Sequence, residues 1–363
     1  MCGVVWCGVV WCGVVWCGVV WCGVVWCGVV WCGVVWCVSC RVVSCRVVSC
    51  RVVSCRVVSC RVVSCRKKSF TNQGHTGRTG PIQKFVVQQA GYYVIEAAGA
   101  RGGTLSCNYG SFPGTYLGGK GATMKGVFFL AAGTVLKIVV GHRGGDAVEV
   151  KGGRSTKQTA ASLGLSVEDN AGTGGGGGSF VYTSTNTLLL AAGGGGGGAA
   201  HHSPGIDGQI TTAGSPCSKE GVFDSVNVGG KDGGPGHCNT AGASHHGGVG
   251  AGWNGKGCAR LTSKHGETGG SRLENWIGGS AGGMNSGNNG GPPPGAVGGF
   301  GGGGGGAEDS GASGGGGGYS GGGSGNKEMY AGGGGGSFCG GISCTGAVGG
   351  NTNDYGFVNI IHT

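Results

Sequence analysis

Five uninterrupted runs of glycine constrain the fold of this chain more than any other feature of its sequence. A glycine run has no side chains to bury, so any ordered structure it forms must be held by backbone hydrogen bonds. Polyproline-II helices meet this requirement, because they have no internal hydrogen bonds and, without Cβ atoms, can pack side by side and bond laterally. The runs span residues 174–178, 193–198, 301–306, 314–318 and 332–336.

A high glycine content without a Gly-X-Y period is also typical of disordered chains, and ordering each glycine is entropically costly. The runs, however, are similar in length and lie between segments rich in aromatic and branched residues. Residues 180–192, FVYTSTNTLLLAA, read as a hairpin with its turn at 183–187 and a glycine run on each side. A flexible linker would not need such anchors, so we expect a packed bundle of polyglycine helices.

The first part of the chain consists of two pentapeptide repeats, CGVVW at 2–36 and VVSCR at 42–66. A period of five places successive repeats on different faces of a helix or a strand, so neither element gains a consistent buried face. The two tracts correspond to repeats of the DNA words TGGTG and GTCGT, which encode the same pentapeptide in every forward frame. We therefore interpret residues 1–68 as disordered low complexity, a translated microsatellite, with an apolar membrane anchor as the alternative.

Without residues 1–68, the chain has a much smaller net charge and far fewer cysteines. Residues 1–68 contribute eight of the basic residues behind the formal net charge of +10, which leaves +2 for the rest of the chain. The basic balance is therefore no argument for nucleic-acid binding. The same residues hold 14 of the 20 cysteines. The six remaining cysteines are Cys107, Cys217, Cys238, Cys258, Cys339 and Cys344.

An even number of cysteines suits disulfide bonds in an extracellular protein, although six allow 15 pairings. Cys339 and Cys344 are close enough in sequence to close a local loop. Cys217, Cys238 and Cys258 share one irregular segment and have scope to pair. Disulfides are the expectation for these six residues, and free buried thiols are the alternative.

Strand-like segments flank the glycine-rich part. Residues 82–103 and 125–145 each contain two extended runs, and the chain closes with FVNIIH at 357–362. No long amphipathic helix pattern is present, so the sequence predicts a mainly β fold, a β-sandwich with a glycine-rich insertion. The predicted bounds are 69–363 for the domain, with 69–150 and 351–363 as the sandwich and 151–350 as the glycine-rich body.

Alternation near the start of this domain indicates which side chains face the core. In a strand, successive side chains point to opposite faces of the sheet. Tyr93, Ile95 and Ala97 alternate with Tyr92, Val94 and Glu96, so we expect one of these two sets to face a sandwich core.

Five segments that are not simple glycine runs suggest a family when taken in order. They are FTNQGHTGRTGPIQ, YYVIEAAGARGG, KGVFFLAAGTVLKIVVGHRGGDA, LLLAAGGGGGG and GFVNIIH. Together they resemble the glycine-rich extracellular domain of the anaplastic lymphoma kinase and leukocyte tyrosine kinase receptors, over most of residues 70–362. The resemblance implies a tumour-necrosis-factor-like β-sandwich joined to a bundle of polyglycine helices. It also implies an extracellular position, a small basic protein ligand and receptor dimerisation that activates a kinase.

The chain also departs from that family. After GPIQ the family has a longer stretch before its next strand, whereas Lys84 and Phe85 follow at once here. Before the last strand, the vertebrate receptors have two acidic residues around Gly-His-Gly. Here only Asp354 lies near a matching place, followed by Tyr355, so the charges available for a ligand differ.

Motifs of catalysis are not found in the sequence. Matches to GxGxxG carry no information in so glycine-rich a chain, and there is no phosphate-binding loop with Gly-Lys-Ser/Thr and no kinase signature set. The cysteines lack the paired spacing of a zinc site, so solvated loop positions are expected for the histidines. We therefore predict no enzymatic activity in this chain, no cofactor and no metal.

Candidate ligand contacts follow from the predicted strands. Glu96, Asp354 and Tyr355 would lie on or near the sandwich and are predicted to contact a protein ligand, with solvated surface as the alternative. Trp253 and Trp276 are expected to be packing anchors, with contact to a partner as the alternative.

The favoured interpretation is an extracellular protein-ligand-binding domain from a receptor tyrosine kinase. The membrane and kinase parts of such a receptor are absent from this chain, so contact with a membrane is expected only through a missing segment. The alternative is a stand-alone secreted structural or matrix protein.

Overall fold

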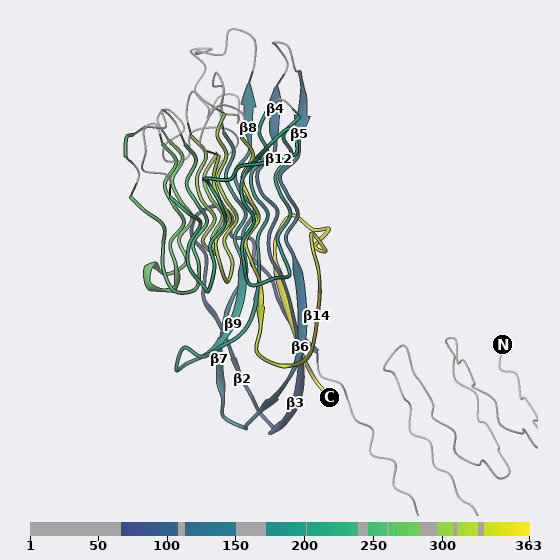
Figure 1. Cartoon of the computed structure of the whole chain (residues 1–363). Coiled ribbons are helices and arrows are strands. Elements are labelled where there is room, and N and C mark those ends of the chain that lie inside the picture. The colour runs from purple at the N-terminus through teal and green to yellow at the C-terminus, as the bar shows by residue number, and fades with distance from the viewer. Residues whose placement is uncertain are drawn as a thin grey trace, which may run out of the picture. The chain divides into compact units, whose positions relative to one another are not determined.

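The computed structural model contains two five-stranded sheets, and seven of their ten strands coincide with segments that were predicted to be extended (Figure 1). The structure describes residues 67–107, 113–149, 172–200, 202–238, 246–259, 261–263, 265–282, 296–307, 311–325 and 330–363. These belong to one compact unit, Lys67–Thr363. Of the segment predicted as disordered low complexity, 1–68, residues 1–66 lie outside the described residues, whereas Lys67 and Lys68 are in a strand of the folded unit, which corrects the predicted boundary.

The first sheet has the order β1-β15-β3-β6-β14, and neighbouring strands are antiparallel. Its strands are β1 (Lys67–Phe70), β15 (Phe357–His362), β3 (Gly91–Ala98), β6 (Thr123–Leu130) and β14 (Ile342–Ala347). The second sheet has the order β13-β10-β9-β7-β2 and is also antiparallel. Its strands are β13 (Phe338–Cys339), β10 (Leu188–Ala192), β9 (Ser179–Thr183), β7 (Val135–Val139) and β2 (Gln83–Val86).

Smaller elements complete the regular structure of the described residues. A three-stranded sheet has the order β5-β4-β8, in which β4 and β8 are parallel, and β11 pairs with β12. Their bounds are β4 (Leu105–Cys107), β5 (Gly114–Tyr116), β8 (Ala147–Glu149), β11 (Ser218–Lys219) and β12 (Val222–Phe223), and a single-turn 3-10 helix, η1, spans Arg272–Glu274. The part of the chain that the structure describes contains no helix long and apolar enough to cross a membrane.

The two large sheets face each other across a hydrophobic core, which makes the fold a β-sandwich. Of the two alternating sets on β3, Tyr93, Ile95 and Ala97 are the ones buried in this core. They pack with buried residues of the second sheet, among them Leu136 and Val181. Burial of one such aliphatic side chain stabilises the fold by about 1.5–3 kcal/mol.

The sandwich takes strands from beyond the bounds predicted for it. β9 and β10 form the hairpin expected at 180–192, and both belong to the second sheet. β13 and β14, just before residue 350, likewise belong to the two large sheets. Figure 1 shows the large sheets at one end of the unit and β4, β5 and β8 at the other, with the glycine segments running side by side between them.

The glycine run at 193–198 shows how these segments are held together. None of its backbone hydrogen bonds joins two residues of the run, and most residues three apart bond to the same neighbouring segment. For example, Gly194 and Gly197 donate at 2.8 and 2.9 Å to the carbonyl oxygens of Gly317 and Gly314. The neighbours of the run are segments 100–103, 119–122, 173–176, 314–317 and 332–335, together with Ile206 and the Ser337 hydroxyl.

Close approach of the backbones excludes side chains from the run. All six glycines at 193–198 are buried. A Cβ on Gly193, Gly195 or Gly196 would overlap a carbonyl oxygen of an adjacent segment. The hydrogen bonds that order this part of the chain therefore depend on the absence of Cβ atoms.

Candidate protein-binding surface

The outer face of the first sheet carries large apolar side chains. Tyr92 on β3 and Phe129 on β6 are directly opposite in the antiparallel register. Their rings meet edge to face with centroids 5.4 Å apart, and they are 53% and 64% exposed. Exposed aromatic pairs of this kind are enriched at protein interfaces.

A second row of apolar side chains lies beside this pair. Val94 faces Val127 across β3 and β6, Ile361 of β15 is opposite Val94, and Ile342 of β14 is opposite Val127. Ile342 is 61% exposed. Apolar residues therefore cross four neighbouring strands, and we call this set the outer apolar patch: Tyr92, Val94, Val127, Phe129, Ile342 and Ile361.

A polar row borders the outer apolar patch and contains the predicted contact Glu96. Asn359 of β15 and Lys125 of β6 are the register partners of Glu96. Asn359 donates its Nδ2 to the Glu96 carboxylate at 3.0 Å and accepts a hydrogen bond from the Ser69 hydroxyl at 2.8 Å. Glu96 is thus held in place within the sheet, and Lys125 beside it is exposed.

Asp354 and Tyr355 lie in the loop before β15, where the sandwich meets the glycine segments. The Asp354 carboxylate is 3.6 Å from Arg101 Nε and 3.8 Å from Arg143 Nε, and its carbonyl accepts the Arg101 N–H. Arg143 also contacts Asp146 at 2.6 Å. Burial acts to lower the pKa of Arg143, but the bond to Asp146 and the charge of Asp354 raise it overall.

The main effect of these contacts is to hold the loop in place. Burial raises the pKa of Tyr355 above its ordinary value, although the charge of Arg143 acts in the opposite direction. Asn351 Nδ2 donates to the carbonyl oxygens of Gly99 and Tyr355 and so ties the loop to a glycine segment. Because Asp354 is 55% exposed, its ion pairs contribute about 0–1 kcal/mol.

The structure therefore separates the three predicted contact residues into two places. Asp354 and Tyr355 share one loop, whereas Glu96 accepts a hydrogen bond from Asn359 inside the first sheet. Sequence reasoning missed the exposed aromatic pair. A signal for it was present, because Phe128 and Phe129 are consecutive in a strand and only one of them can face the core.

Two tryptophan side chains cover part of the outer face of the second sheet, whereas the outer face of the first sheet is exposed. Trp276 stacks on Phe180 of β9 with centroids 3.9 Å apart, and Trp253 meets Tyr182 edge to face at 5.3 Å. Trp253 and Trp276 are 9% and 1% exposed. Both therefore act as packing anchors, as predicted.

Two disulfide bonds join four of the six candidate cysteines. Cys339 pairs with Cys344, the local loop that the sequence allowed, and Cys238 pairs with Cys258. Cys217 is a free thiol and is buried. Burial raises its pKa far above the ordinary value, so this thiol stays protonated and unreactive. Cys107 lies in β4.

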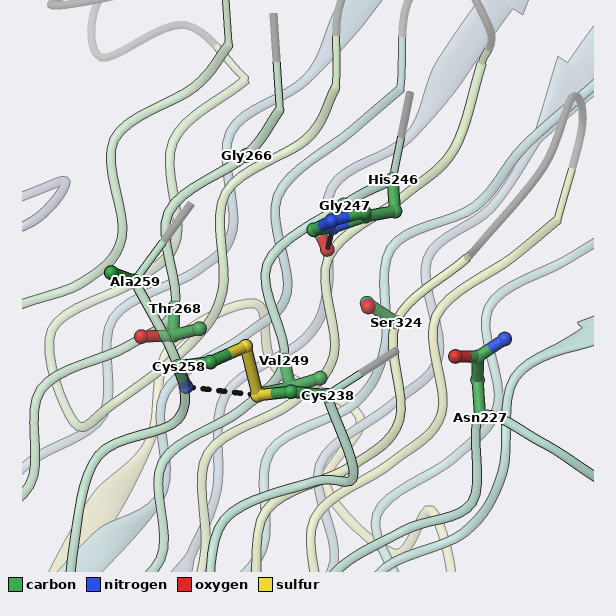
Figure 2. A pocket seen from close by; sticks show the side chains of 10 residues that line it. All are labelled: Asn227, Cys238, His246, Gly247, Val249, Cys258, Ala259, Gly266, Thr268 and Ser324. Atoms are coloured by element: carbon green, nitrogen blue, oxygen red, sulfur yellow. Dashed lines mark hydrogen bonds between the residues drawn. A yellow bond between two sulfur atoms is a disulfide. The ribbon is translucent and has the colours of Figure 1, made fainter. Parts of the chain in front are cut away.

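A small cavity lies beside the Cys238–Cys258 disulfide (Figure 2). His246 and Thr268 are among the residues that line it, and Cys258 N–H donates to Cys238 Sγ at 2.8 Å. The cavity has a volume of about 10 Å³, which is room for about one water molecule. Within the described residues, no three His, Cys, Asp or Glu side chains gather as they would around a metal ion.

Comparison with known proteins gives no functional assignment, so the outer apolar patch is the main indication of function. The chain matches no protein-family model and no curated protein. Disulfide bonds are typical of proteins in oxidising, extracellular surroundings. Large exposed apolar side chains on one sheet face are also typical of surfaces that contact another protein.

Proposed function

We propose that this chain is an extracellular protein-binding domain of the receptor-ectodomain type, and that its ligand docks on the outer apolar patch. The observation that carries the proposal is the continuous apolar surface across β15, β3, β6 and β14, with Tyr92, Phe129 and Ile342 all more than half exposed. Monomeric proteins seldom leave such a surface open to water without a partner. Glu96 and Lys125 at its border would set the orientation of the ligand.

The finer fold assignment belongs to the same proposal. We infer that the glycine segments are polyproline-II-like helices, because the hydrogen bonds of residues 193–198 are all lateral and most of them repeat every three residues. The resemblance of the non-glycine segments to the anaplastic lymphoma kinase family supports a tumour-necrosis-factor-like sandwich. It also supports a basic protein ligand, receptor dimerisation and a parent receptor tyrosine kinase.

Binding to basic secreted proteins, the ligand class that the resemblance implies, tests the proposed surface. The protein is immobilised and offered such proteins in solution, and variants F129S and I342S should bind at least tenfold more weakly, a loss of about 1.4 kcal/mol. The matched control is L117S, because Leu117 is 51% exposed and lies outside the patch. Unchanged binding by F129S and I342S would place the ligand elsewhere.

A stand-alone secreted structural protein is the second candidate, and the disulfides fit it equally well. The transcript that follows the codon for His362 separates the two. An open frame through a cysteine-rich module, an apolar 20-residue segment and kinase motifs supports the receptor. A stop codon at that place, with a signal peptide upstream, supports the secreted protein.

A further inference from the structure

Two lysines face each other on the outer side of the second sheet. Lys84 of the edge strand β2 and Lys137 of β7 are direct register partners. Like charges placed opposite each other destabilise an antiparallel pair. Among the described residues, no carboxylate lies within 4.0 Å of either ammonium group. The pair is therefore an uncompensated positive charge on an exposed edge.

Aromatic side chains connect this pair to a third cation. Lys137 Nζ lies 5.7 Å from the centroid of the Tyr182 ring, and Tyr182 is the register partner of Lys137 on β9. Trp253 contacts the same Tyr182 ring and carries the guanidinium of Arg272 at 5.0 Å from its own centroid. Burial raises the pKa of Tyr182, and the hydrogen bond from Trp276 and the positive charge of Arg272 act against it.

Among the described residues, no carboxylate lies within 4.0 Å of the Arg272 guanidinium. The residue is half-buried, and its Nε, which is fully buried, has no hydrogen-bond acceptor among these residues. Glu274, two residues away, accepts instead from the backbone N–H and the hydroxyl of Ser271, which completes the capping box of η1. An anionic group from outside would pair with the part of this cation that is not buried.

The surroundings indicate what kind of anion fits. Tyr182 and Trp253 are only 2% and 9% exposed, so no open ring face is offered to a nucleobase or a sugar. Apolar side chains are exposed instead: Leu273, next to Arg272, is 68% exposed, and Val86, on the same face of β2 as Lys84, is 45% exposed. Beyond residue 68 the net formal charge is only +2, too little for a broad polyanion-binding surface.

We propose that Lys84, Lys137 and Arg272 form a docking site for an acidic peptide segment of a partner protein, whose apolar side chains contact Val86 and Leu273. We call this set of five residues the basic edge site. Carboxylates of the peptide pair with the three cations and relieve the repulsion between the two lysines. The basic edge site lies on the second sheet and is separate from the outer apolar patch on the first.

Fluorescence anisotropy with a labelled Asp-Leu-Glu-Glu-Leu-Asp peptide at about 50 mM salt tests the basic edge site, because ion pairs are little screened there. The double variant K84Q/K137Q and the single variant R272Q should each weaken binding at least tenfold. The matched control K120Q removes an exposed lysine that lies outside both large sheets and should change binding less than twofold. Equal weakening by K120Q, or no binding of the peptide at millimolar concentration, would overturn the proposal.

Two further measurements compare the peptide with other anionic ligands and check the fold of the variants. A heparin fragment and a single-stranded DNA oligonucleotide are titrated in parallel, and tighter binding of either one that K84Q/K137Q abolishes would contradict the peptide assignment. Thermal unfolding checks the fold of the variants, and K84Q should unfold no earlier than the unmodified protein, because it removes a repulsive pair. Unfolding at a clearly lower temperature would show that Lys84 has a structural role and would count against the site.

Discussion

The Cα atom of Gly195 packs so closely against the carbonyl oxygen of Gly119 that a methyl group on Gly195 would occupy the space of that oxygen. Gly119 in turn donates its N–H to the carbonyl oxygen of Gly196 at 2.9 Å. Neither backbone can move away without breaking hydrogen bonds to a further segment. Order in this part of the molecule therefore depends on bare backbone at particular positions.

Replacing Gly195 by alanine should lower the stability of the domain by about 3 kcal/mol or more, because backbone rather than a flexible side chain must give way. Thermal unfolding followed by circular dichroism measures the loss. The control is Gly255→Ala, because nothing lies within 4 Å of a Cβ at Gly255. That variant should match the unmodified protein or gain about 0.4–1 kcal/mol. Equal stability of the two variants would contradict close packing of the glycine run.

His142 should make the domain less stable in acid. Its side chain is fully buried and contacts the Gly77 carbonyl oxygen through Nδ1 at 3.1 Å. Burial lowers its pKa from 6.5 to about 4, against the Gly77 hydrogen bond and with a contribution from the charge of His75. Between those two values the unfolded chain binds more protons than the folded one, so stability falls as the pH falls from 6.5 towards 4.

The maximum effect is about 3 kcal/mol, from about 1.36 kcal/mol for each unit of pKa difference. Urea unfolding at pH 7 and at pH 4.5 measures it. In His142→Gln the difference between the two pH values should shrink, because that side chain does not titrate. A variant with an unchanged difference would show that other groups cause the acid sensitivity.

The two disulfides should differ in what they contribute to stability. Cys238 and Cys258 are 20 residues apart, whereas Cys339 and Cys344 are only five apart. Closing a longer loop removes more entropy from the unfolded chain, so we expect losses of about 3 and about 2 kcal/mol for the two double serine variants. Urea unfolding under non-reducing conditions measures both, and the reverse order would mean that strain or local packing outweighs loop entropy.

The sequence predicts those parts of the fold whose structure is determined by side chains. Alternation predicts that one of the two faces of β3 is buried, and short separation allows Cys339 to pair with Cys344. Glycine runs carry no side chains, so no sequence pattern indicates that the N–H of Gly194 donates to the carbonyl oxygen of Gly317. For the same reason, the sequence did not show that the strands around the runs belong to the sandwich.

The candidate site was predictable only in part. Glu96 was expected on or near the sandwich, and β6 contains two consecutive phenylalanines, so only one of them can face the core. The contribution of Ile342 depends on the pairing of β14 with β6, two strands that are distant in sequence. The separation of Asp354 from Glu96 likewise follows from the contacts of Asp354 with Arg101 and Arg143, which no spacing in the sequence indicates.

Trp276 gives the last test, since a packing anchor and a partner contact respond differently to substitution. Its ring stacks on Phe180, and its indole N–H donates to the Tyr182 hydroxyl at 3.4 Å. Trp276→Ala should therefore lower the free energy of unfolding by about 3–5 kcal/mol. Trp276→Phe keeps the stacking and should lose only about 1 kcal/mol with the hydrogen bond. Urea unfolding followed by circular dichroism measures both variants, and an alanine variant as stable as the phenylalanine variant would contradict the role of Trp276 as a packing anchor.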